Sequence, residues 1–275
     1  MRKLLGLILL LALPLWAKDL QVKEVKLDLS KFHHSREYEQ LMRACKKREI
    51  ATKDSGISIQ TIKTDRPKIN AALLKAIGPL DKISQIYRRI IRNDFLANMD
   101  EDHIPGCYSA YKVEVSYLGR HGPLEMFSLW RYEDMGWIHP METTNHYLFR
   151  GDKEIKLADL LEPGGREKLL EKLLQYERLY WAKYEQDAAV MQGDDFPELS
   201  DAAKKKVLAE FKLPGKKELK KLRQSHLIEN VFYFDQRGLV FLYPPYAIAG
   251  YSAGYVELVI PLSELKGIVR EEFLH

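Results

Sequence analysis

The feature that most constrains the fold is an aromatic, strand-rich segment near the C-terminus, residues 230–261 (NVFYFDQRGLVFLYPPYAIAGYSAGYVELVIP). Its alternation predicts three strands, at residues 231–234, 239–243 and 255–260. Gly238 suits the left-handed backbone of the first turn. Pro244 and Pro245 end the second strand, because a proline nitrogen cannot donate to a ladder. We therefore expect an antiparallel meander interrupted by one tyrosine-bearing loop, residues 246–254.

The same segment carries four short motifs in a fixed order. They are an aromatic hairpin, a Pro-Tyr-x-Ile-Ala segment, a closing Gly-x-Val-x-x-x-Ile-Pro strand and a short helix, at residues 232–241, 245–249, 254–261 and 262–266. Together they resemble the C-terminal domain of unknown function shared by RsiV-like lysozyme-sensing anti-sigma factors and PdaC-like peptidoglycan deacetylases. Residues 136–140, 147–149 and 155–161 resemble the earlier part of this family. The resemblance covers roughly the C-terminal half of the chain.

This resemblance implies a recognition role in the cell envelope, with a lysozyme-like muramidase or peptidoglycan as the ligand. The contact residues that it favours are Pro245, Tyr246, Tyr251 and His139. Deacetylase activity belongs to a separate catalytic domain of PdaC-like proteins, which we do not find in this sequence. Anti-sigma members carry a cytoplasmic segment and a transmembrane helix before the domain, so control of a sigma factor is not expected here.

Each contact residue also has a purely structural interpretation. Tyrosine in a loop of small residues is typical of recognition surfaces, yet the rings of Tyr246 and Tyr251 could instead fold back and cap the sheet. Tyr255 is expected to do so because it begins a strand. For His139, a functional role competes with burial against a backbone carbonyl. Relatives have a small residue where this chain has Trp137 or Ile138, which alters the surroundings of that histidine.

The remainder of the chain predicts an α+β fold, in which helices pack on antiparallel sheet. Alternating apolar residues predict strands, and apolar residues at helical spacing predict helices. The strands fall near residues 22–29, 57–63, 108–118, 124–132 and 143–150, and the helices near residues 33–49, 67–77, 81–99, 167–189, 201–211 and 216–225. We divide the chain into a signal peptide (1–17), an N-terminal PdaC-like subdomain (18–118) and the RsiV-like domain (119–275). The alternative is that residues 18–275 form one compact unit.

The first residues predict export. Two basic residues precede an apolar run at residues 4–16, and Ala17 suits a cleavage site. No later segment is long and apolar enough to cross a membrane, so we expect a soluble periplasmic or secreted protein without a stable membrane anchor. In an oxidising compartment, Cys45 and Cys107 favour a disulfide over two buried thiols.

Other classes of chemistry lack a signature. A net charge of +4 is too small to indicate nucleic-acid binding. No motif for a metal, cofactor or nucleophile is present, and the acidic turn at residues 100–103 reads as solvated. Nine Lys or Arg residues between Lys204 and Arg223 could touch anionic polymer or lipid headgroups, but such a run is usually the solvated face of helices. Alternative functions are an envelope hydrolase that uses His139 with a carboxylate, and a structural subunit of an envelope assembly.

Overall fold

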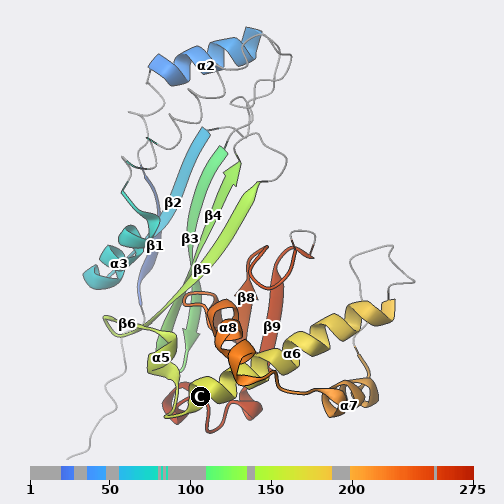
Figure 1. The fold of residues 1–275 in the computed structure, drawn as a ribbon. Helices are drawn as coiled ribbons and strands as arrows, with labels where there is room; N and C mark the ends of the chain where they lie inside the picture. Colours follow the sequence, from blue (N-terminus) through green and yellow to red (C-terminus); the bar gives the residue numbers. More distant parts are fainter. Residues whose placement is uncertain are drawn as a thin grey trace, which may run out of the picture.

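The structure, a computed structural model, describes residues 20–27, 36–47, 56–79, 82, 85, 110–134, 140–187, 199–250 and 253–275. A long six-stranded sheet and a separate three-stranded sheet organise these residues (Figure 1). The large sheet has the order β1 (Val22–Lys26), β2 (Gly56–Thr64), β3 (Ala110–His121), β4 (Leu124–Asp134), β5 (Met141–Arg150) and β6 (Lys153–Ile155). The small sheet has the order β7 (Phe232–Asp235), β8 (Gly238–Tyr243) and β9 (Val256–Pro261).

Helices accompany both sheets, which confirms the predicted α+β class. They are α2 (Arg36–Lys47), α3 (Pro67–Ile77), α5 (Leu157–Leu160), α6 (Gly165–Asp187), α7 (Asp201–Glu210) and α8 (Lys216–His226), with the 3-10 turns η3 (Leu262–Glu264) and η4 (Glu271–Phe273). Pro67 opens α3, where its missing N–H costs nothing. Ser200 caps α7 by accepting a hydrogen bond from the Ala203 N–H at 3.2 Å. Most of the helix predicted at residues 81–99 lies outside the described residues.

One strand pair departs from the antiparallel pattern. β2 and β3 pair in parallel, whereas the other neighbouring strands of both sheets are antiparallel. Parallel neighbours need a long crossover connection, and α3 lies in the connection between them. Its apolar residues recur at intervals of four, so that Ile69, Leu73 and Ile77 all face the core.

Two hydrophobic cores flank the large sheet, and β4 serves both of them. Leu124 and Met126 belong to a core with the small sheet, α5 and α6. Phe127 and Leu129 belong to the core formed with α3 and β2. Because successive side chains of a strand point to opposite faces, a single strand couples the two cores. Residue 118 lies within β3, so the boundary proposed there falls inside a strand of the continuous sheet.

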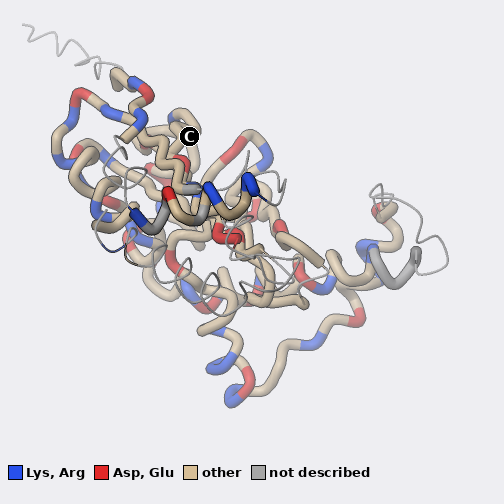
Figure 2. Tube along the Cα trace, turned by 90° about the horizontal axis from the view of Figure 1, so that it is seen from above, with Lys and Arg blue, Asp and Glu red and all other residues tan. Residues whose placement is uncertain are grey.

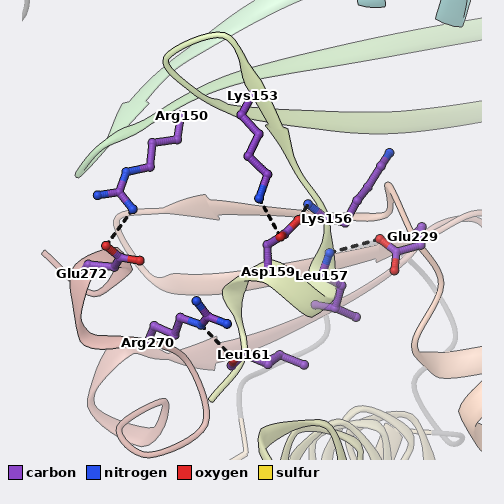
Figure 3. Close-up of polar contacts among 9 residues, drawn as sticks. All are labelled: Arg150, Lys153, Lys156, Leu157, Asp159, Leu161, Glu229, Arg270 and Glu272. Carbon is purple, nitrogen blue, oxygen red and sulfur yellow. Dashed lines mark hydrogen bonds and ion pairs between the residues drawn. The ribbon is translucent and has the colours of Figure 1, made fainter. Parts of the chain in front are cut away.

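Polar contacts fasten the segments that flank the small sheet to the end of β5 and to α5 (Figure 3). The Arg150 guanidinium at the end of β5 lies 2.7 Å from the Glu272 carboxylate. Arg270 donates from Nε to the Leu161 carbonyl at 3.1 Å, and the Glu229 carboxylate accepts a hydrogen bond from the Leu157 N–H at 3.1 Å. These contacts hold the segments that precede and follow the small sheet against β5 and α5.

Candidate recognition site

The loop between β8 and β9 begins with a tight turn at residues 244–247. The Ala247 N–H donates to the Pro244 carbonyl at 3.1 Å, and Tyr246 has a φ of 68°. Proline at the second position and a positive φ at the third are the features of a type II turn, in which glycine normally fills the third position. Tyrosine is strained in this conformation. Tyr246 is 62% exposed, the largest value among the exposed large hydrophobic residues of the described part of the chain.

The loop has two faces. Ala247, Ile248, Ala249 and Ala253 pack against the core beneath the small sheet, whereas Tyr246 faces solvent. In Figure 1 the loop lies beyond the ends of β8 and β9. Small apolar residues therefore anchor the loop, and Tyr246 exposes most of its surface to solvent.

The strand that leads into the turn is held by a buried polar network. The Tyr243 hydroxyl donates to the His226 carbonyl at 2.6 Å, and burial raises the pKa of Tyr243 well above its usual value. His226 Nε2 lies 2.8 Å from Glu177 of α6, and Nδ1 lies 3.1 Å from the Leu222 carbonyl. β8, α6 and α8 are thereby joined directly behind the loop.

Ser225 lies beside the same imidazole ring, and its hydroxyl oxygen is 2.9 Å from Nδ1 of His226. Both ring nitrogens of His226 thus have a polar neighbour within hydrogen-bond distance. Because His226 is only 2% exposed, the network is shielded from solvent and serves to hold the two helices and β8 together.

The end of the loop is connected to the large sheet. The Thr144 hydroxyl of β5 lies 3.4 Å from the hydroxyl of Tyr255, at the long limit for a hydrogen bond. Burial raises the pKa of Tyr255, and the neighbouring Glu142 acts in the same direction. The half-buried ring of Tyr255 covers the sheet, as its position before a strand predicts.

A cleft of about 540 Å³ opens where the β3–β4 hairpin meets the small sheet. It is lined by Leu118, Arg120, His121, Met126, Tyr233, Phe234, Asp235, Gln236 and Leu262. The His121 ring stacks on Phe234 at 4.3 Å, and its Nε2 lies 3.0 Å from the Phe273 carbonyl. Burial lowers the pKa of His121, and the hydrogen bond to Phe273 offsets part of this effect.

A triad of charged residues stabilises the β7–β8 turn beside the cleft. Arg237 bridges Asp235 and Glu257, each with one oxygen 2.6 Å from a guanidinium nitrogen. Although burial acts to raise it, the hydrogen bonds and charge of Arg237 hold the pKa of Asp235 below its usual value. The single Arg237 guanidinium therefore holds both carboxylates in place beside the cleft.

A second histidine lies between the sheets. His146 of β5 is buried, its ring lies 4.4 Å from that of Tyr233 in a tilted arrangement, and its Nδ1 has no hydrogen-bond partner. Burial lowers the pKa of His146 to about 4, so the ring is neutral near pH 7. Sequence patterns did not single out His121 or His146, because their environment depends on the contact between two sheets that are distant in the sequence.

The predicted contact residues divide into two groups. Pro245 and Tyr246 are described and lie together in the turn. Tyr251 and His139 lie outside the described residues, so their roles stay predictions. Cys45 is buried on α2, whereas Cys107 lies outside the described residues, and the disulfide also stays a prediction.

Neither a metal centre nor a membrane-spanning helix occurs in the described part of the chain. No three His, Cys, Asp or Glu side chains there come together as a metal centre would require. None of the described helices combines the length and apolar character that a bilayer span needs.

Comparisons with known proteins show a similar fold, and a sequence match over part of the chain to a family of unknown function. No curated protein matches the sequence. A DUF3298 family protein from Pseudomonas aeruginosa PAO1 has a similar structure, with a TM-score of 0.53 and 16% identity over 93% of this chain and 94% of that chain. A member from Bacteroides fragilis NCTC 9343 has a TM-score of 0.55 and 14% identity over 92% and 94%. At such low sequence identity, the structural similarity shows a shared fold alone. In sequence, residues 158–263, which include the whole β8–β9 loop, match the family described as a protein of unknown function, DUF3298.

Proposed function

We propose that this chain is an exported recognition protein of the cell envelope, and that it docks on a lysozyme-like muramidase through the turn at residues 244–247. The observation that carries the proposal is the exposed Tyr246 ring, held at a positive φ. Backbone strain in an ordered segment often accompanies function. Exposed tyrosines are frequent anchors of protein interfaces.

The shape of the site favours a protein ligand with a cleft over a glycan strand. An exposed ring on a turn beyond the ends of the strands is convex, so its natural complement is concave. A muramidase has such a concavity, because it must enclose a glycan chain. The rigid support also fits this role, since a docking residue fixed before binding loses less entropy on association. The resemblance of the loop motif to lysozyme-sensing proteins supports the same ligand.

Binding of the full chain to hen egg-white lysozyme tests the proposal, with insoluble peptidoglycan as a separate probe. Tyr246→Ala should weaken lysozyme binding by about thirtyfold or more, as truncation of a central interface anchor does. Tyr246→Phe should retain most of the affinity, because it keeps the ring. Met141→Ala is the matched control, since Met141 is also an exposed apolar side chain but lies on β5.

Three results would overturn the proposal. If the wild-type protein does not bind lysozyme but sediments with peptidoglycan, the glycan is the ligand. Unchanged lysozyme binding by Tyr246→Ala would place the site elsewhere. Equal losses in Tyr246→Ala and Met141→Ala would show that the turn has no special role.

A further inference from the structure

Residues 204–223, which comprise most of α7 and α8 with their connection, concentrate positive charge. They hold nine basic and two acidic residues. This local excess of seven charges is larger than the net charge of +4 of the whole chain. Seven of the lysines are exposed, and we call them the basic surface: Lys205, Lys206, Lys212, Lys216, Lys217, Lys220 and Lys221.

The described fold offers the lysines of the basic surface no ionic partner. Arg223 forms an ion pair with Glu167 at 2.8 Å. Within the part of the chain that the structure describes, no lysine of the basic surface forms an ion pair. Self-repulsion within such a group is unfavourable, so a complementary anionic surface would relieve it.

Exposed leucines accompany the lysines. Leu208 is 39% exposed and Leu213 is 46% exposed. Leu208 follows Lys205 by three residues on α7, which places both on one side of the helix. Leu213 directly follows Lys212 in the connection. The core-facing residues of this region are others, namely Phe211, Leu219 and Leu222, and α7 contributes no buried residue.

We infer that the basic surface with Leu208 and Leu213 is a peripheral docking surface for an anionic lipid bilayer. Lysines attract anionic headgroups, while leucines enter the boundary between headgroups and acyl chains. A soluble polyanion would match the charge but would give the two leucines nothing to enter. The combination of both features therefore favours a bilayer over a free polymer.

Vesicle sedimentation of the full chain tests this inference. Vesicles made of equal parts of phosphatidylglycerol and phosphatidylcholine should bind the protein, and vesicles of pure phosphatidylcholine should not. Lys216→Glu with Lys217→Glu should weaken binding at least about twentyfold, since each surface lysine contributes about fivefold. The new acidic residues lie in the first turn of α8, where they favour the helix. Leu208→Ser with Leu213→Ser should weaken binding about fivefold or more, although the charge is unchanged.

Matched controls come from other elements. Figure 2, which looks down on α2, shows basic positions on that helix as well. Lys46→Glu with Lys47→Glu on α2 makes the same charge change on another exposed site. Leu74→Ser on α3 removes a leucine of similar exposure, 49%. Both control variants should bind vesicles within about twofold of the wild type.

The inference fails if wild-type protein ignores the anionic vesicles. It also fails if the control variants lose as much binding as the α7–α8 variants. The leucine variant could bind vesicles as well as the wild type does, and both proteins could bind inorganic polyphosphate equally well. This result would identify the surface as a site for soluble polyanions instead. Circular dichroism of each variant confirms that it is folded.

Discussion

At Tyr246 the backbone adopts a left-handed conformation that favours glycine, with a φ of 68°. This conformation costs a non-glycine residue about 1–2 kcal/mol. Tyr246→Gly should therefore raise the free energy of unfolding by about 0.5–1 kcal/mol, measured by urea denaturation, because glycine adds flexibility to the unfolded chain but removes the strain. The same variant should lose lysozyme binding. A less stable variant would show that contacts of the ring outweigh the strain, and that the conformation needs no functional explanation.

His146 gives the fold a specific dependence on pH. Burial lowers its pKa to about 4 in the folded state, compared with about 6.5 in an unfolded chain. The unfolded state therefore binds a proton more readily. The contribution of neutral His146 to stability should be fully present above about pH 6.5. The free energy of unfolding should fall by about 2–3 kcal/mol as the pH drops to 4.

A single substitution separates this contribution from those of other groups. His146→Phe keeps an aromatic ring against Tyr233 and removes the titrating group, so its stability should fall less between pH 7 and pH 4.5. Urea unfolding at the two pH values measures the difference. His275→Gln, at an exposed histidine, should behave like the wild type. Equal pH dependence in His146→Phe and the wild type would contradict the assignment.

At the level of secondary structure, the β7–β8 hairpin depends on Gly238. Its φ is 149°, and a Cβ atom there would lie 2.1 Å from the Ile260 carbonyl oxygen of β9. Gly238→Ala should therefore destabilise the protein by about 2 kcal/mol or more, measured by urea denaturation. Gly250→Ala is the control, because a Cβ atom at Gly250 meets open space. Similar stability of the two variants would mean that β9 shifts without cost.

Local patterns predicted most of these elements, because the spacing of apolar residues and the signals that start or end an element depend on neighbouring residues. The meander, the cap at Ser200 and the proline at the start of α3 are examples. The parallel pairing of β2 and β3 was missed, since it depends on where a long connection returns the chain. The loop that follows Pro244 and Pro245 was predicted from its composition, but the sequence left open whether the Tyr246 ring is exposed or caps the sheet. The cleft beside His121 was not predicted, because its walls come from two sheets.

For the whole molecule, the shared strand β4 determines how the two cores unfold. Because Met126 faces one core and Phe127 faces the other, neither core can lose its order without exposing the back of the other. We therefore expect one cooperative transition, although the sequence divides the chain near residue 118. Leu73→Ala in one core and Phe241→Ala in the other should each cost about 2–5 kcal/mol.

Calorimetry and tryptophan fluorescence test this expectation together. Both variants should lower the midpoint of the same transition, and the two methods should report the same midpoint. Leu74→Ala, one position along α3 on the exposed side, should change stability by no more than about 0.5 kcal/mol. Two separate transitions, each shifted by only one of the core variants, would show that the cores unfold independently despite the shared strand. The boundary near residue 118 would then separate two units that unfold independently. Backbone strain at Tyr246 in the β8–β9 loop could then not affect the stability of the core that contains α3.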